Sequence, residues 1–385
     1  MSPTTRRPSP QLDVDALLRD PGTRIIVCCG SGGVGKTTTA AALGLRAAEQ
    51  GRSVVVLTID PARRLAQSMG LVELDNTPRE VAGVDTSAGG RLDAMMLDMK
   101  RTFDEIVETH STPDKAQQIL ANPFYQALSS SFAGTQEYMA MEKLGQLRAQ
   151  ADQDGTWDLV VVDTPPSRSA LDFLDAPARL GSFLDGRFIR LLAAPAKKGG
   201  RAYMKAFSAG VNAVTGTLTK VLGAQVLKDV QTFVAALDTM FGGFRERADA
   251  TYQLLQHEGT AFLVVAAPER DALREAAYFV ERLARDDMPL GGLVLNRVHE
   301  VAPGAPSAER ALAAAEALGE GSGHTLTQQL LRLHADRVRV AEREQQISER
   351  FTGAHRTVPV RRVRARAQDV HDLPGLRDIG ADLAG

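Results

Sequence analysis

Glycines, a lysine and a threonine near the N-terminus have the spacing of a phosphate-binding loop. The segment Gly30–Thr37 reads GSGGVGKT and fits the pattern G-x-x-x-x-G-K-[ST]. The backbone N–H groups of such a loop, with the start of the following helix, form an anion site. Lys36 would reach the β- and γ-phosphates of a nucleotide, and the Thr37 hydroxyl would ligate Mg²⁺. The residues predicted to contact the nucleotide here are Gly32, Gly33, Val34, Gly35, Lys36, Thr37 and Thr38.

Two aspartates follow apolar runs that are typical of buried strands. Asp60 stands in Thr58–Ala62 (TIDPA), and Asp163 stands in Val161–Pro166 (VVDTPP). Because ligands bind at the carboxyl ends of parallel strands, we expect both carboxylates to face the phosphates. Asp163 would hold Mg²⁺ through a water molecule, and Asp60 would orient and deprotonate the attacking water. The alternative for each is an ordinary turn or helix-cap aspartate.

The elements around the loop are those that would position it. Arg24–Cys29 (RIIVCC) is typical of a buried strand, and Thr38–Gln50 is typical of a helix. Other unalternated, mostly β-branched runs are Ser53–Ile59, Arg91–Leu97, Asp158–Val162, Ala261–Ala266 and Gly292–Leu295. We expect a last short run, Arg356–Val360, to close one edge. The pattern predicts an α/β protein with a mostly parallel, doubly wound sheet.

A different periodicity interrupts the strand pattern. Between Ala178 and Gln256 apolar residues recur every three to five positions, which indicates helices. Lys100–His110 and Gln117–Leu128 also predict helices. We therefore predict an all-helical subdomain inserted into the sheet at 100–140 and 179–256. The nucleotide-binding core would comprise 21–99, 141–178 and 257–385, after a partly disordered extension at 1–20. Ala302–Ser307 is also expected to be disordered.

Composition limits the classes of function. The chain has 385 residues, 44% of them apolar, and a formal net charge of −2, so charge does not suggest nucleic-acid binding. No apolar run approaches the roughly 18 residues that span a bilayer, and no signal peptide is visible. Cys28 and Cys29 are adjacent in one strand and point to opposite faces, so they cannot share a metal. We expect a cytoplasmic protein, with any contact to a membrane being transient.

Taken together, these segments resemble a known family. The Gly30–Thr38 loop, the two aspartate segments, Ala266–Glu269 (AAPE) and Asn296–Arg297 are similar to the arsenite-efflux and tail-anchored-protein-targeting ATPases. That family belongs to the SIMIBI class of P-loop NTPases, so the resemblance implies that fold, with ATP and Mg²⁺ as cofactors. It also implies a dimer that faces across the nucleotides, and a helical subdomain that moves with the ATP state.

The resemblance also implies how the base is held. In the family an asparagine after the sixth strand reads the adenine ring, which corresponds to Asn296. A segment near the C-terminus covers the base, and its expected counterpart is Thr357–Val360, with Pro359 and Val360 as contacts. The alternative for Asn296 is a strand-end asparagine that caps a turn.

One residue of the loop departs from the family pattern. Members carry a second lysine, which reaches the partner's phosphates as an arginine finger does, where this chain has Ser31. The interpretation we favour is a heterodimer whose homologous subunit supplies the lysine; a homodimer stays open. A second interpretation is that Arg63, Arg64 or Arg168 substitutes for it. A third is a slow or inactive hydrolase, a nucleotide-gated scaffold subunit that uses ATP as a switch.

The client of the helical subdomain also stays open. The metalloid-binding and zinc-binding cysteines of the family are missing, which disfavours capture of arsenite by thiolates. The stripe within Met204–Phe244 is either bundle core or a groove for a hydrophobic helix, such as that of a membrane-protein client. A MinD/ParA-like positioning ATPase is a further alternative, but Leu373–Leu383 is short and broken by glycine for a membrane-binding helix. Five arginines within Arg356–Arg366 form either a phosphate- or lipid-binding patch or a solvated strand face offset by Asp369, Asp372 and Asp378.

Overall fold

The computed structural model describes residues 9–60, 64–123, 125–126, 135–165, 246–318 and 324–385. The chain divides into two compact units. The first comprises Met1–Met96, Asp154–Ala170 and Leu255–Gly385, and the second comprises Leu97–Gln153 and Leu171–Leu254. Most of the predicted insertion at 179–256 lies outside the described residues, so the proposed domain boundaries stay predictions.

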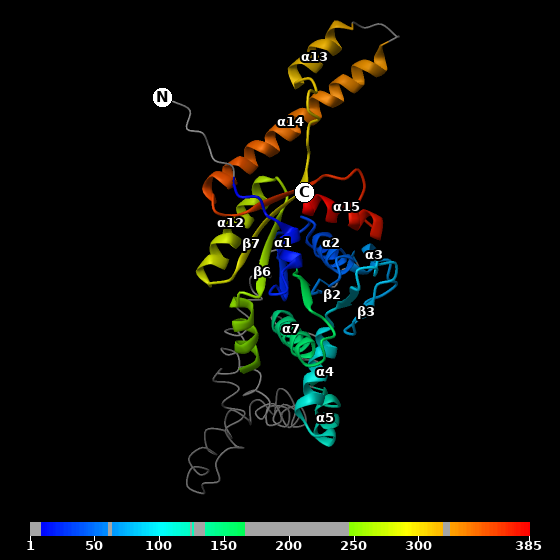
Figure 1. Cartoon of the computed structure of the whole chain (residues 1–385), viewed down its shortest axis with the longest axis vertical. Helices are drawn as coiled ribbons and strands as arrows, with labels where there is room; N and C mark the ends of the chain where they lie inside the picture. The colour runs from blue at the N-terminus through cyan, green and yellow to red at the C-terminus, as the bar shows by residue number, and fades with distance from the viewer. Residues whose placement is uncertain (1–8, 61–63, 124, 127–134, 166–245, 319–323) are drawn as a thin grey trace, which may run out of the picture. The chain divides into compact units, whose positions relative to one another are not determined.

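An eight-stranded sheet forms the centre of the first unit, in the order β3-β4-β2-β5-β1-β6-β7-β8 (Figure 1). All neighbours are parallel except β3 and β4. The strands are β1 (Ile25–Cys29), β2 (Ser53–Thr58), β3 (Arg79–Glu80), β4 (Arg91–Met96), β5 (Leu159–Asp163), β6 (Thr260–Ala266), β7 (Leu290–Val298) and β8 (Val360–Arg364). The predicted α/β fold with a mostly parallel sheet is confirmed.

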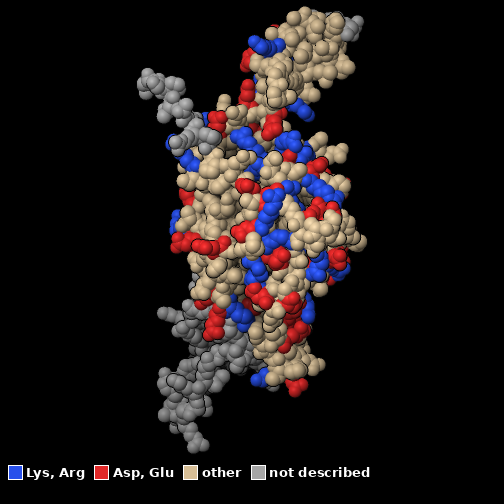
Figure 2. Space-filling view, viewed as in Figure 1, with Lys and Arg blue, Asp and Glu red and all other residues tan. Residues whose placement is uncertain are grey.

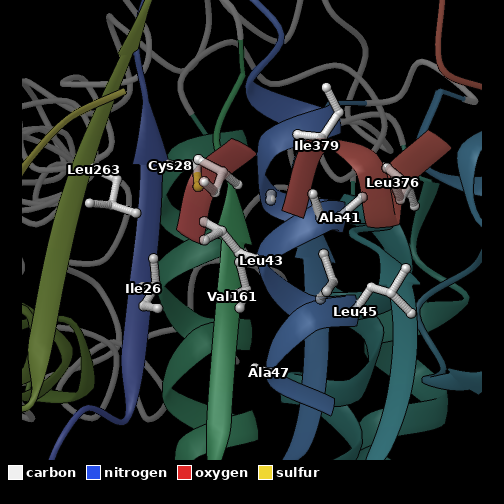
Figure 3. Packing of buried hydrophobic residues seen from close by; sticks show 14 of the residues in the cluster. Ile26, Cys28, Ala41, Leu43, Leu45, Ala47, Val161, Leu263, Leu376 and Ile379 are labelled. Atoms are coloured by element: carbon white, nitrogen blue, oxygen red, sulfur yellow. The ribbon is translucent and has the colours of Figure 1, made fainter. Parts of the chain in front are cut away.

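The central strands are mostly hydrophobic because both of their faces are covered. Every residue of β1, β5 and β6 is buried. Figure 3 shows Ile26, Val161 and Leu263 from three neighbouring strands facing helices α2 (Lys36–Glu49) and α15 (Leu373–Ala384). Helix α2 is rich in alanine because it packs very close to the sheet: a Cβ on Gly44 would lie 2.5 Å from Val56 Cγ2. The middle of α2 is thereby held close to β2.

The remaining helices of the first unit are α1 (Val14–Arg19), α3 (Arg64–Ser68), α12 (Arg270–Arg285), α13 (Ala308–Ala317) and α14 (Thr325–Ala354). Helices α13 and α14 pack as a hairpin (Figure 1) around a small core to which Ala308, Ala311, Ala335 and Val338 contribute. The sequence pattern did not predict this hairpin. Disorder was expected just before it, at Ala302–Ser307, but the chain forms a turn there, closed by the Ala305 N–H bond to Ala302 O at 3.0 Å.

The described part of the second unit is helical. It contains α4 (Met99–His110), α5 (Pro113–Leu120), α7 (Thr135–Asp154, whose last residue belongs to the first unit) and a helical segment at 246–256 that continues past the unit boundary. A buried carboxylate joins two of these helices: Glu142 accepts hydrogen bonds from Tyr138 Oη at 3.0 Å and from Arg247 Nε at 2.8 Å. The helix expected at Gln117–Leu128 instead begins at Pro113, a residue well suited to a first helical turn.

The C-terminal region differs from the prediction in three respects. The last strand is Val360–Arg364 and not Arg356–Val360. The stretch from Leu373 forms one continuous helix, α15, despite Gly375 and Gly380. The carboxylate that offsets the arginines at the end of β8 and just after it is Asp382, which pairs with Arg364 at 2.6 Å and with Arg366 at 2.8 Å.

Charges of both signs are interspersed on the face shown in Figure 2. Within the described ranges, no helix combines the length and the apolar character that crossing a bilayer requires.

Candidate nucleotide-binding site

The phosphate loop connects the end of β1 to the start of α2 at the carboxyl edge of the sheet. Gly30 has φ +150°, and a Cβ there would lie 2.1 Å from the carbonyl oxygen of Val265 on β6. Gly35 has φ +93° and immediately precedes the helix. Side chains are therefore excluded at both ends of the loop. Without side chains at these two positions, the loop presents its backbone N–H groups together with the N-terminus of α2. Such groups bind anions.

Lys36 lies inside the loop. Its Nζ donates a hydrogen bond to Ser31 O at 2.9 Å, and the residue is 6% exposed. Burial lowers the pKa of Lys36, while the negative charges of Asp163 and Asp60 act in the opposite direction. Ser31 is also buried, and its Oγ has no hydrogen-bond partner among the described residues. The ammonium group of Lys36 is thus hydrogen-bonded to the backbone of its own loop.

Asp163 ends β5 and is completely buried. Its Oδ2 accepts a hydrogen bond from Thr58 Oγ1 at 2.9 Å, and Thr37 also hydrogen-bonds to the carboxylate. Burial raises the pKa of Asp163 to about 6, although both threonines and Lys36 counteract this rise. The other oxygen, Oδ1, has no hydrogen-bond partner within the described part of the chain.

These contacts fit a magnesium ion. A buried carboxylate oxygen without a partner, beside a threonine hydroxyl, is an oxygen donor set of the kind that Mg²⁺ prefers. Thr37 and Asp163 would hold the ion, Asp163 through a water molecule. The bound ion would neutralise charge on the phosphates.

Hydrogen bonds attach the two aspartate segments to the sheet at the ends of β2 and β5. The Asp60 N–H bonds to Thr58 Oγ1 at 3.2 Å, and the Ile59 N–H bonds to Asp163 O at 2.9 Å. Thr164 Oγ1 donates to Cys28 O at 2.8 Å. The backbone at the start of each segment is therefore fixed, and the two segments follow adjoining strands. Thr58 and Thr164 were given no role from the sequence, although each lies within one of the predicted aspartate segments.

Asn296 reaches the phosphate loop from β7. It is 7% exposed, and its Nδ2 donates a hydrogen bond to Val34 O at 2.8 Å. The structure does not bring Pro359 and Val360 to the same place, because Val360 pairs with Leu293, three residues before Asn296. The backbone of both is used in the sheet: Pro359 O accepts from Leu293 N, and Val360 N donates to Pro10 O. Residues from Ala365 onward follow β8 at the phosphate edge, where the Ala365 N–H bonds to Val298 O at 2.9 Å.

Several predicted features lie outside the described residues. They are Pro61, Ala62, Pro166, two of the candidate substitute cations, Arg63 and Arg168, and the stripe within Met204–Phe244. The third candidate cation, Arg64, is exposed at the start of α3.

A parallel sheet with a glycine-rich loop between its first strand and a helix, and an aspartate ending the neighbouring strand, defines a P-loop NTPase fold. A model of the anion-transporting ATPase family matches residues 23–303. This chain belongs to that family, as the resemblance predicted.

Three curated relatives show the extent of the similarity. The chain is 32% identical over 155 residues to ATPase GET3 of Malassezia globosa, covering 40% of this chain and 43% of that protein. It is 30% identical over 171 residues to ATPase get3 of Schizosaccharomyces pombe, covering 43% and 47%. It is 25% identical over 269 residues to the ATPase ASNA1 homolog of Cryptosporidium parvum, covering 70% and 63%. The match thus spans about half the length of these relatives.

Proposed function

We propose that this chain binds Mg-ATP at the phosphate loop and hydrolyses it. Lys36 and the loop amides neutralise the phosphates, Thr37 and Asp163 hold Mg²⁺, and Asp60 positions the attacking water. The observation that carries the proposal is the buried Asp163 carboxylate, hydrogen-bonded by Thr58 and Thr37 and electrostatically coupled to Lys36. A buried carboxylate costs stability unless a charge compensates it, and a bound cation would supply that compensation.

The test is phosphate release from ATP by the purified full-length chain, with and without Mg²⁺. Replacing Asp60→Asn should abolish turnover while leaving Mg-ATP binding intact. Asp85→Asn, at an exposed position of the same unit, is the matched control and should have no effect. Equal turnover by the Asp60→Asn variant and the wild type would remove Asp60 from the mechanism. Mg-ATP binding without any turnover, alone or with a homologous subunit, would instead support the nucleotide-gated scaffold.

We further propose that the active assembly is a dimer with a homologous subunit that supplies a cation in trans. Position 31 offers a buried hydroxyl and not a charge, and Lys36 is bonded within its own loop. Turnover should therefore rise when a homologue with a lysine at this position is added. A rise in the Ser31→Lys homodimer would support the same argument. If neither change raises turnover, the missing-lysine argument is wrong.

Residues 365–371 are better placed to cover the base than Pro359 and Val360 are. Arg364 pairs with Val298, so the chain that leaves β8 does so beside the end of β7 that carries Asn296. Photocrosslinking with 8-azido-ATP, followed by peptide mapping, tests this assignment. Labelling within 365–371 would support it, whereas labelling of Pro359 or Val360 would restore the original prediction.

The nucleotide state would be passed to a client that binds the helical subdomain. A client with a hydrophobic helix is the proposal we favour over arsenite. Burial raises the pKa of Cys29 to about 12 and that of Cys28 well above its ordinary value, which opposes formation of the thiolates that would bind a metalloid. Helix α15 also argues against a membrane-surface ATPase, because its apolar residues Leu376, Ile379 and Leu383 are buried. Detergent-free co-purification of a tail-anchored segment would support the helix client.

A further inference from the structure

Asn296 lies at a β-bulge near the end of β7, and its side chain reaches the phosphate loop. The pairing of β7 with β8 shifts between Leu295, which faces Arg362, and Val298, which faces Arg364. One extra residue is therefore accommodated on β7. Arg297 takes the left-handed conformation with φ +61°, which is uncommon for a residue with a side chain. By the regular alternation of a strand, Asn296 lies on the face of Val294, which packs in the same core cluster as Val34, and the bulge follows at Arg297.

The amide of Asn296 packs against the backbone of the loop. Asn296 Nδ2 donates to Val34 O at 2.8 Å, and a Cβ on Gly35 would lie 2.2 Å from the same nitrogen. Asn296 thus contacts the peptide between Val34 and Gly35 on both sides of the bond. Among the loop residues, Gly35 is the one that leaves room for the Asn296 amide, because a Cβ on Gly33 would contact nothing within 4 Å.

This contact fixes the orientation of one peptide group. In a trans peptide the C=O of Val34 and the N–H of Gly35 point in opposite directions. Holding the carbonyl toward β7 therefore turns the Gly35 N–H away from β7. A loop whose carbonyl turned inward would place a partial negative charge where an anion should bind.

We propose that Asn296 is a positioning residue for the phosphate loop, so that it acts on the triphosphate and not primarily on the base. The inference rests on the proposed nucleotide binding and differs from the base-reading role implied by the family resemblance. It predicts that loss of Asn296 weakens the binding of all triphosphates by the same factor, whatever base they carry. If Asn296 instead recognised the base, its loss would weaken the binding of adenine nucleotides alone.

The experiment measures binding of Mg-ATP, Mg-GTP and Mg-tripolyphosphate to the full-length chain by calorimetry. Asn296→Ala removes the amide, and Asn296→Asp keeps its shape but cannot donate to Val34 O. Both variants should lose about tenfold or more in affinity, equally for the three ligands. Thr260→Ala removes a buried polar side chain at the opposite end of the strands and is the matched control; it should bind as the wild type does.

Nuclear magnetic resonance of Gly35 separates positioning of the loop from general damage to the fold. In the wild type the Gly35 amide proton should move downfield when tripolyphosphate binds, and this shift should be lost in Asn296→Ala while the remaining spectrum is retained. A loss confined to ATP, or affinities unchanged for all three ligands, would overturn the inference. A wild-type chain that binds none of the three would instead refute the proposed function, and this inference with it.

Discussion

The Thr58 hydroxyl donates a hydrogen bond to the Asp163 carboxylate at 2.9 Å, across the paired ends of β2 and β5. The same hydroxyl accepts the N–H of Asp60 at 3.2 Å. One threonine therefore joins the candidate magnesium residue to the backbone of the residue proposed to position water. This contact also leaves the second oxygen of Asp163 available, since only Oδ2 is used.

Replacing Thr58→Val should shift the pH dependence of Mg-nucleotide binding upward. The hydrogen bond from Thr58 favours the ionised form of Asp163, so its loss raises the pKa of a carboxylate that is already at about 6. The midpoint should rise by about one pH unit. Binding titrations at several pH values measure it, and Thr58→Ser, which keeps the hydroxyl, should restore the wild-type midpoint. An unchanged midpoint in the valine variant would contradict the assignment.

Asp163→Asn should stabilise the ligand-free protein at pH 7 while abolishing its response to Mg²⁺. The pKa of Asp163 is higher in the folded state than its ordinary 3.8, so folding favours the protonated form. Stability is therefore lost as the pH rises from about 4 through about 6, by an amount on the order of 2 kcal/mol at neutral pH. Thermal unfolding at pH 5 and pH 7 should show this dependence in the wild type and not in the variant. A variant less stable than the wild type at pH 7 would contradict the prediction.

The stability that Asp15 contributes should depend on pH in the opposite sense to that of Asp163. Its hydrogen bonds with Arg46, at 2.6 and 2.8 Å, lower its pKa to about 2. The contribution, about 2 kcal/mol, is fully present above pH 4 and is lost as the pH falls through the folded-state pKa. Asp15→Asn should therefore be destabilised at pH 7 and converge with the wild type near pH 2. Denaturant unfolding across this range tests it, and a constant difference would exclude the ionic explanation.

Arg52→Ala should destabilise the first unit strongly. Its guanidinium bonds to Asp158 Oδ1 at 2.7 Å and to the carbonyl oxygens of Leu18, Asp20, Thr23 and Asp158. Loss of a buried charged donor that serves several acceptors costs about 3–5 kcal/mol. Arg52→Lys should recover little, because an ammonium lacks the planar fork. Arg79→Ala, which breaks an exposed pair with Asp75, is the control and should leave stability almost unchanged, because solvent screens exposed ion pairs.

The sequence predicted the sheet well because its strands are buried on both faces. Apolar runs rich in β-branched residues identified β1, β2, β5, β6 and the centre of β7, and the mainly apolar run Arg91–Leu97 identified β4. The two-residue β3 carries exposed Arg79 and Glu80, so it has no hydrophobic signal. The start of β8 was misplaced because alternating arginines mask it: Arg361 and Val363 are buried while Arg362 and Arg364 are exposed.

Long-range pairing could not be predicted from local pattern. The arginines within Arg356–Arg366 were expected to be offset by Asp369, Asp372 and Asp378, yet Asp382 on the following helix pairs with two of them, Arg364 and Arg366. Similarly, the loop motif identified Lys36 and Thr37, but it carried no information on what supports the loop. The contact between Asn296 and Val34 joins residues that are 262 positions apart, and such a contact leaves no local signature in a single sequence.

The strand order has a consequence for how the protein is made. Strand β1 is the first to leave the ribosome, but its two neighbours are β5 and β6, with Ile25 paired to Val160 on one side and Thr260 on the other. A nascent chain that ends before β6 therefore exposes one hydrogen-bonding edge of a wholly apolar strand. The phosphate loop, which follows β1 directly, cannot receive its support from Val265 and Asn296 until most of the chain has been translated.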